Sequence, residues 1–357
     1  DLTVGNSGEV VFTFNNESIS GGQLSSAPHN INTDRWYHIA LTRNETGAYR
    51  LYVDGILLDS DAGNAPRPNT YRALLGAMDN GTSASNNFNG WIDEVKIWNT
   101  ALTTEQIWFM MNQEIIPSPT IAGNVQGSVI PLDIPNLSSA HLAGYYKMES
   151  TNIGCGYLNS TLGNNIRGKL KNITSQLVRS APLPYTSSSD GDWTNVSTWT
   201  NSAVWDIPNA NGINGDPINW NIVKTAHNIS SDTKDITVLG LLVDANELSI
   251  QNPAAPLDET NNGQMLWVTH YLKLDGKIDL VGESQLIQKR YLPSQINQSI
   301  LDAASTGSLE RDQQGTTNLY NYNYWGSPVS TIDTSQNNMP YSIGSVLYDG
   351  SNSNNPL

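Results

Sequence analysis

Hydrophobic and polar positions alternate along much of the first hundred residues, which is the pattern of β-strands that face a core on one side. In residues 35–43, RWYHIALTR, the side chains of Tyr37, Ile39 and Leu41 fall on one face, and the opposite face is also partly apolar. A strand with two partly apolar faces is typical of the inside of a sandwich.

The segment that follows predicts two hairpins in succession. NETG at 44–47 predicts a turn, AYRLYV at 48–53 the returning strand, and Asp54-Gly55 a second, tighter turn before ILL. A type I′ turn needs positive φ at both central residues, and Asp-Gly is among the pairs that adopt it most readily. We therefore expect consecutive antiparallel strands over residues 35–58.

Three further elements are predicted before residue 115. RALLGAM at 72–78 and WIDEVKIWN at 91–99 read as strands, the second with Trp91, Val95 and Ile97 on one face. TTEQIWFMMNQ at 103–113 reads as the one clear helix, because Thr103 with Gln106 fits a capping box.

The remainder of the chain divides by composition and by strand spacing. Residues 116–139 are rich in Pro, Gly and Ser and predict a linker, while 140–180 predict a truncated module or, preferably, a strand pair that docks on its neighbour. Short strands at roughly ten-residue spacing over 181–300 predict a β-sandwich or a β-solenoid, with the solenoid somewhat favoured. Residues 301–357 read as the start of a further β region. The predicted fold class is therefore all-β.

Composition narrows the choice of partners. The chain has 357 residues, of which 14% are charged, and its formal net charge is −15. An acidic surface rich in Asn, Ser and Thr argues against nucleic acid and anionic membranes as partners. No apolar run is long enough to span a membrane, so we expect a protein that is not transmembrane. The single Cys155 excludes an internal disulfide.

The order of these segments resembles a known family. RWYHIALTRNETGAYRLYVDGILL, then LLGAMDN, then FNGWIDEVKIWNTALTTEQI are similar to the second half of a laminin-G-like, concanavalin A-like jelly roll. The resemblance covers about residues 1–115 and implies a partial jelly-roll sandwich without its opening strands. The chain is therefore expected to be a fragment of a larger precursor.

The rest of the chain resembles multidomain surface proteins of Bacteroidetes that use the type IX secretion system. SAPLPYTS, LKLDGKIDLVGESQLIQ and NYNYWGSPVS are similar to segments of that group. This resemblance implies an extracellular or cell-surface location in a Gram-negative bacterium, with the secretion machinery as a partner in transit.

Catalytic patterns are not found. The resemblance implies that glycosidases on this fold would need carboxylates at alternate positions of one strand, so that both side chains point the same way. Asp93 and Glu94 are adjacent and point to opposite faces of a regular strand. No zinc, nucleophile-elbow or phosphate-loop motif is present either. We therefore predict a protein that is not an enzyme.

Calcium is the expected cofactor, if any, because hard cations prefer carboxylate, amide and backbone oxygens. In laminin-G-like modules calcium lies between loops at a rim of the sandwich. The candidate ligands are Asp79 and Asn80, with Asp59 and Asp61 on an earlier loop. Asp190 to Asn195 form a weaker oxygen cluster. The alternative is that Asp79, Asn80 and Gly81 simply form a turn.

Aromatic side chains are the expected sugar-binding groups, because an exposed ring can stack on the apolar face of a pyranose. Trp193 and Trp199 lie in a polar context, and Tyr322 and Tyr324 share one face of an alternating run. The alternative is that these aromatic faces are packed in a core.

These features favour a non-enzymatic adhesin-type surface protein that binds glycans or cell-surface proteins through its loops, with calcium as a possible aid. Two alternatives remain: an accessory binding region of a secreted carbohydrate-active enzyme, and a structural stalk.

Overall fold

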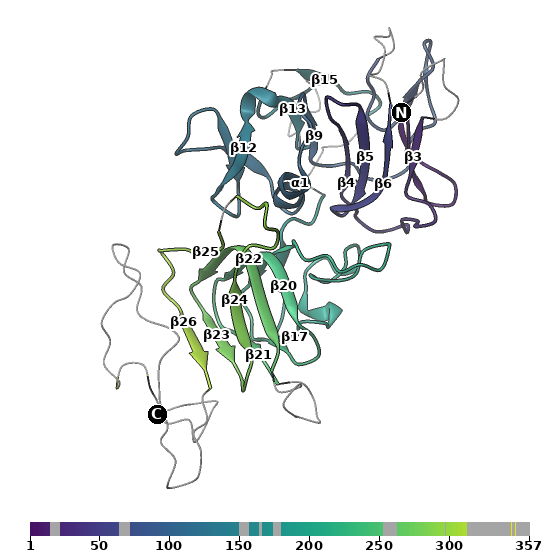
Figure 1. The fold of residues 1–357 in the computed structure, drawn as a ribbon. Coiled ribbons are helices and arrows are strands. Elements are labelled where there is room, and N and C mark those ends of the chain that lie inside the picture. Colours follow the sequence, from purple (N-terminus) through teal and green to yellow (C-terminus); the bar gives the residue numbers. More distant parts are fainter. Residues whose placement is uncertain are drawn as a thin grey trace. The chain divides into compact units, whose positions relative to one another are not determined.

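The structure is a computed structural model that describes residues 1–14, 22–63, 72–149, 157–163, 166–173, 180–252, 263–296, 298–312, 344 and 347. The chain forms two compact units (Figure 1). The first contains residues 1–184, 203–206 and 210–218, and the second contains the remaining residues from Tyr185 onward. Nearly all regular elements are strands, which confirms the all-β fold class. Among the described residues, no helix is both long and apolar enough to span a membrane.

Two antiparallel sheets form the sandwich at the start of the first unit. They have the orders β1-β2-β3 and β4-β5-β6. Buried residues from both sheets share one core, including Val10 and Leu24 from the first and Tyr49, Leu51 and Val53 from the second. The strands are β1 (Leu2–Val4), β2 (Val10–Thr13), β3 (Gln23–Ser25), β4 (Ile39–Arg43), β5 (Ala48–Val53) and β6 (Ile56–Ala62).

The predicted hairpins are confirmed. Strand β5 pairs antiparallel with both β4 and β6. Asp54 and Gly55 have φ values of 49° and 77°, the positive values that the tight turn requires. The two hairpins therefore build one wall of the sandwich, and their apolar residues are used for packing.

Two predicted strands are much shorter than expected. Residues 72–77 form no strand, and β7 (Met78–Asp79) pairs only with β8 (Ala84–Ser85). Strand β9 runs from Val95 to Trp98, so Trp91 lies outside it. The prediction that Trp91 and Val95 share one face of a strand is wrong, because Glu94 has a φ of 54° and breaks the extended backbone between them.

Helix α1 (Thr104–Met111) begins at the predicted capping box. The Gln106 backbone N–H donates to the Thr103 hydroxyl at 3.2 Å, and the Thr103 N–H donates to the Gln106 side chain at 2.9 Å. The indole N–H of Trp108 donates to the Gly55 carbonyl at 2.8 Å, which ties the helix to the β5–β6 turn.

The segment predicted as a linker is a sheet. Strands β10 (Ile115–Pro117), β11 (Asn124–Gly127) and β12 (Asp133–Ser138) pair antiparallel in that order. The buried Gln113 holds the loop between β11 and β12, because its side-chain oxygen accepts the backbone N–H groups of Val129 and Ile130 at 3.1 and 2.9 Å. The Pro and Gly residues therefore mark turns between strands.

The described part of residues 140–180 contributes one strand to the preceding module, and whether the whole range docks on it stays a prediction. After a short 3₁₀ turn, η1 (Ser139–His141), strand β13 (Leu142–Tyr146) pairs antiparallel with β9. A small hairpin of β14 (Tyr157–Asn159) and β15 (Arg167–Lys169) follows. Strand β9 thus finds its partner more than forty residues later in the chain.

The second unit is a parallel β-solenoid, the somewhat favoured of the two predicted alternatives. Strands taken in chain order alternate mostly between two sheets, and every strand pair within these sheets is parallel. The first sheet contains β16 (Tyr185–Thr186), β18 (Ile222–Thr225), β20 (Ile236–Val243), β22 (Met265–Leu274), β24 (Gln285–Gln288) and β25 (Ile300–Leu301). The second contains β17 (Gly191–Asp192), β19 (Ile229–Ser231), β21 (Glu247–Ile250), β23 (Lys277–Leu280) and β26 (Ser308–Arg311).

The solenoid core consists of stacked aliphatic rows. Ile229, Leu248 and Ile278 occupy equivalent positions of neighbouring strands in the second sheet, and all three are buried. Strand β26 continues this sheet by pairing with β23, so the solenoid extends beyond the predicted boundary at residue 300.

Candidate functional site

An aromatic loop on the first unit presents the most exposed tryptophan for which the structure gives a value. We define the aromatic loop as residues Phe88–Ile92, between β8 and β9. The Trp91 side chain is 74% exposed and Phe88 is 45% exposed. Large aromatic side chains are normally used in cores, so an indole left in solvent is a feature that requires an explanation.

The start of the aromatic loop is fixed by backbone and ring contacts. The Phe88 N–H donates to the Gly76 carbonyl at 2.8 Å. A Cβ built on Gly90 would lie 2.7 Å from Cε1 of Phe88, so the phenyl ring occupies the space that any other residue at 90 would need. Glycine at 90 therefore lets the phenyl ring pack over the loop backbone.

The end of the loop is fixed by a carboxylate. Oδ2 of Asp93 accepts the backbone N–H groups of Ser180 and Ala181, each at 2.8 Å. Its other oxygen accepts the Glu94 N–H at 2.8 Å. The aromatic loop is consequently held at both ends.

Glu94 binds partners inside the first unit. Its Oε2 accepts a hydrogen bond of 2.6 Å from the Tyr145 hydroxyl and lies 2.8 Å from Lys96 Nζ. Burial, followed by the negative charge of Glu94, raises the pKa of Tyr145 well above its ordinary range. Asp93 and Glu94 therefore both bind structural partners.

The predicted calcium ligands are occupied by other contacts. Asp79 receives the Arg72 guanidinium through both oxygens, at 3.1 Å from Nε and 2.5 Å from Nη2. This pairing holds the pKa of the Asp79 carboxyl below its usual range. The Asn80 side-chain oxygen accepts the backbone N–H groups of Thr82 and Ser83 at 3.1 and 2.7 Å, which is the arrangement of a turn.

Asp59 and Asp61 lie on β6 and bond locally or to the neighbouring sheet. Asp59 accepts the Ser25 N–H at 2.8 Å, and Asp61 accepts the Ala62 N–H at 2.7 Å. The described part of the chain brings together no three His, Cys, Asp or Glu side chains that could hold one metal ion. As arranged, the four predicted ligands do not form a common calcium site, and calcium binding stays a prediction.

The predicted tryptophan platforms lie inside the second unit. Trp193 is fully buried and Trp199 is 2% exposed, and their rings meet edge to face at a centroid distance of 4.9 Å. The indole N–H of Trp193 donates to the Pro208 carbonyl at 3.1 Å, and that of Trp199 to the Trp193 carbonyl at 2.8 Å. Neither indole offers a face to a sugar, so the core alternative holds for both. Tyr322 and Tyr324 lie outside the described residues.

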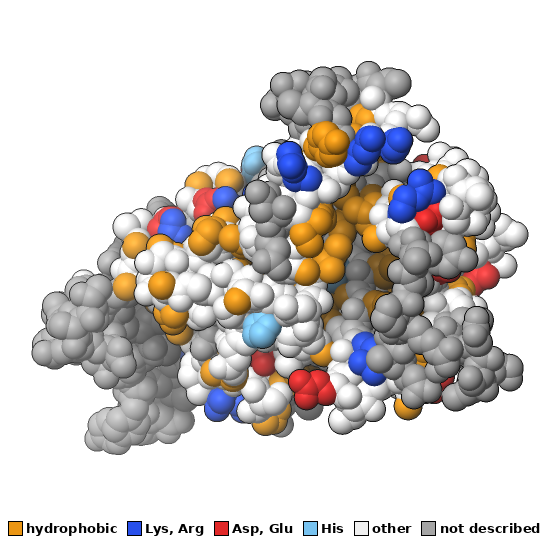
Figure 2. Space-filling model, turned by 90° about the horizontal axis from the view of Figure 1, so that it is seen from above, with side chains coloured by type: hydrophobic (Ala, Val, Ile, Leu, Met, Phe, Trp, Pro, Cys, Tyr) orange, Lys and Arg blue, Asp and Glu red, His pale blue; other side chains and the backbone are white. Residues whose placement is uncertain are grey.

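The sequence did not predict that Trp91 is exposed, because the strand predicted over residues 91–99 began too early. The signal available was the polar surrounding of NNFNGW, in which Asn86, Asn87 and Asn89 flank the aromatic positions. Exposed apolar side chains also gather on the face of the molecule drawn in Figure 2.

Comparison with known proteins supports one part of the fold. Residues 1–108 match the family model described as the concanavalin A-like lectin/glucanases superfamily. The matched residues include the sandwich sheets and the aromatic loop, and the match supports the laminin-G-like resemblance of residues 1–115. Residues 1–108 are therefore similar to concanavalin A-like domains.

Two individual proteins are also similar to parts of this chain. The sushi, von Willebrand factor type A, EGF and pentraxin domain-containing protein 1 of Rattus norvegicus is 29% identical over 141 residues, which cover 37% of this chain and 4% of that protein. A solved structure of a candidate carbohydrate binding protein from Bacteroides ovatus ATCC 8483 is 21% identical, over 48% of this chain and 43% of that one, with a TM-score of 0.28.

Proposed function

We propose that this chain is part of a non-enzymatic, adhesin-type surface protein that binds glycans through the aromatic loop. One observation supports the proposal above all: the Trp91 indole is exposed, on a loop whose two ends are fixed by Gly76 and by Asp93. An indole in this position can stack on the apolar face of a sugar ring.

The rigidity of the loop favours binding. Ordering a flexible loop on association costs free energy, and a loop that is already held avoids most of that cost. Asn87 and Asn89 are exposed beside the aromatic positions and supply amide donors and acceptors for sugar hydroxyls. A stacking ring with adjacent amides is the combination expected for a neutral glycan.

The family match supports carbohydrate or partner binding in general for residues 1–108. An extracellular position at the surface of a Gram-negative bacterium, passage through the type IX machinery and calcium assistance are parts of our proposal that rest on the sequence resemblance alone.

A protein partner is the second candidate, and the aliphatic neighbours of the loop favour it. Leu75 and Ile92 are exposed, and the Ile92 side chain lies next to Gly76, so the apolar surface extends beyond the aromatic rings. Exposed apolar patches of this kind also mark protein interfaces.

A glycan array probed with the purified chain tests the proposal. We expect binding to a subset of glycans, loss of that binding in Trp91→Ala, and partial retention in Trp91→Phe, which keeps a stacking ring. Tyr157→Ala is the matched control, because Tyr157 is an exposed aromatic elsewhere in the first unit. Parallel arrays with calcium and with EDTA test the calcium prediction separately.

Other outcomes have definite meanings. The aromatic loop would be rejected as the site if Trp91→Ala still bound glycans and a substitution outside residues 88–92 abolished binding. The absence of glycan binding in both buffers would reject the glycan proposal and leave the protein partner or the structural stalk. Release of reducing sugar from any bound glycan would instead indicate an enzyme.

A further inference from the structure

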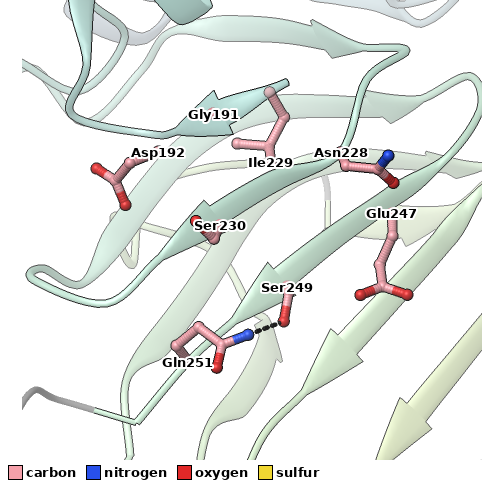
Figure 3. Close-up of a pocket in the computed structure, with 8 residues that line it drawn as sticks. All are labelled: Gly191, Asp192, Asn228, Ile229, Ser230, Glu247, Ser249 and Gln251. Atoms are coloured by element: carbon pink, nitrogen blue, oxygen red, sulfur yellow. Dashed lines mark hydrogen bonds between the residues drawn. The ribbon is translucent and has the colours of Figure 1, made fainter. Parts of the chain in front are cut away.

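An open groove of about 350 Å³ lies on the second sheet of the solenoid (Figure 3). Strands β17, β19 and β21 provide it, with the residues that directly precede or follow them. Six of its eight lining residues carry a carboxylate, an amide or a hydroxyl. The lining residues are Gly191, Asp192, Asn228, Ile229, Ser230, Glu247, Ser249 and Gln251. Both hydrogen-bond donors and acceptors are therefore available along the groove.

Strand alternation explains why polar groups line this face. In β21, Leu248 and Ile250 are buried in the solenoid, and the residues between and beside them point the other way. The pairing register places Ser230 beside Ser249 and Ser249 beside Asp279. The row of outward positions that begins in the groove thus continues onto β23.

The continuation of this row carries an excess of carboxylates. Lys277 Nζ lies 3.2 Å from Oε2 of Glu247 and 2.5 Å from Oε2 of Glu310, so one ammonium group is shared by two carboxylates. Asp192 and Asp279 add two further carboxylates to the same face. The surface beside the groove is therefore negatively charged.

Asp279 is the most enclosed carboxylate of this row. The residue is 6% exposed, and the positive charge of Lys277 acts on its carboxylate. Burial, opposed by Lys277 and reinforced by Glu310, Glu247 and Asp312, raises the pKa of Asp279 to about 6. A further cationic group, on the ligand, would favour the ionised form of Asp279.

We propose that this groove and the adjoining carboxylate row bind a linear glycan that carries free amino groups. The hydroxyl and amide groups of the groove suit sugar hydroxyls, while Glu247 and Asp279 suit ammonium substituents. The groove is open and crosses successive parallel strands, so a polymer can lie across it. The site lies on the second unit and does not depend on the aromatic loop.

Isothermal titration of the whole chain with a β-1,4-linked glucosamine hexamer tests this proposal, and the N-acetylated hexamer is the uncharged counterpart. We expect the amine-bearing hexamer to bind, more weakly as salt screens the charges, and the acetylated hexamer to bind at least tenfold more weakly. Glu247→Gln and Asp279→Asn should each reduce affinity about tenfold. Glu283→Gln, which alters an exposed carboxylate of the same unit, should leave affinity unchanged.

The controls separate this site from the proposed function. Trp91→Ala should leave glucosamine binding intact even if it abolishes binding on the glycan array. Equal affinity for the two hexamers, or full affinity in both carboxylate variants, would overturn the proposal. Spermine that binds as tightly as the glucosamine hexamer would show that amines alone are recognised, and would overturn the glycan assignment. Circular dichroism of each variant distinguishes lost binding from lost folding.

Discussion

The backbone N–H of Ser180 donates a hydrogen bond of 2.8 Å to Oδ2 of Asp93, although 87 residues separate the two. The same oxygen accepts the Ala181 N–H at 2.8 Å. A single carboxylate thereby fixes the end of the aromatic loop and a distant segment of the first unit.

Asp93→Ala should destabilise the first unit. The substitution leaves three partly buried backbone N–H groups, those of Glu94, Ser180 and Ala181, without their acceptor. Each such loss costs about 1–3 kcal/mol. Urea denaturation should show this decrease in the free energy of unfolding. Asp61→Ala removes a carboxylate that bonds only the next residue among the described residues, and it should change stability by under about 0.5 kcal/mol. Equal effects of the two substitutions would contradict the anchoring role.

Arg72→Ala tests calcium at Asp79. In the structure Arg72 occupies both Asp79 oxygens, so a cation would have to displace the guanidinium. Without Arg72 the carboxylate is free, and calcium affinity measured by titration calorimetry should rise. The stability change should be small, because solvent screens an ion pair at the surface. No calcium binding in either the wild type or the variant would reject the calcium prediction at this position.

His38 should make the first unit sensitive to acid. The residue is half-buried, and its Nδ1 is shielded from solvent and has no hydrogen-bond partner among the described residues. Burial, with a smaller effect from the positive charge of Lys96, lowers the pKa of His38 to about 3 from 6.5. The unfolded chain therefore binds a proton that the folded chain does not, and stability falls as pH decreases from about 6.5 to 3. His38→Phe should remove this decrease in urea titrations, whereas His141→Phe, on the surface, should not.

Asp54 should make the stability of the first unit depend on pH in the opposite direction. Burial, assisted by Asp206 and opposed by the His38 backbone N–H and Arg35, raises the pKa of Asp54 to about 7 from 3.8. The folded chain holds the proton more tightly, so stability falls as pH rises from about 4 to 7. Asp54→Asn, which tolerates the positive φ of this turn, should remove that decrease. An unchanged pH profile in both the His38 and Asp54 variants would contradict these assignments.

Asp279→Asn should stabilise the second unit near neutral pH. The carboxyl has a raised pKa of about 6, so its ionisation opposes folding as pH increases from about 4 to 6 and above. Removing the charge should increase the free energy of unfolding at pH 7.5 by about 1–3 kcal/mol. Thermal unfolding at pH 4.5 and 7.5 measures this, with the gain confined to the higher pH. A loss of stability at pH 7.5 would show that the carboxylate has a partner in solution.

The sequence correctly predicted those elements that are fixed by residues close to one another in the chain. The Asp54-Gly55 turn and the Thr103–Gln106 capping box are fixed by residues next to one another, and both form as expected. The end of the strand before Val95 depends on the positive φ of Glu94, which no pattern of hydrophobicity encodes.

Longer-range contacts account for the other differences. Residues 116–139 become a sheet partly because Gln113 bonds their backbone. Trp193 and Trp199 sit among Asn, Ser and Thr in the sequence, but their indole N–H groups find backbone carbonyls inside the unit, so both can be buried. The surface role of Trp91 and the row through Ser249 and Asp279 depend on which strands become neighbours, and a single sequence does not specify that.

The pairing of β9 with β13 has a consequence for how this module can be moved between proteins. The family match ends at residue 108, whereas the partner strand of β9 begins at Leu142. A gene fragment cut at the family boundary would leave β9 with an unpaired edge and Ile97 in solvent, the combination that promotes aggregation. The unit of recombination that can fold is therefore longer than the unit defined by sequence similarity, and transplanted versions should include residues through at least Tyr146.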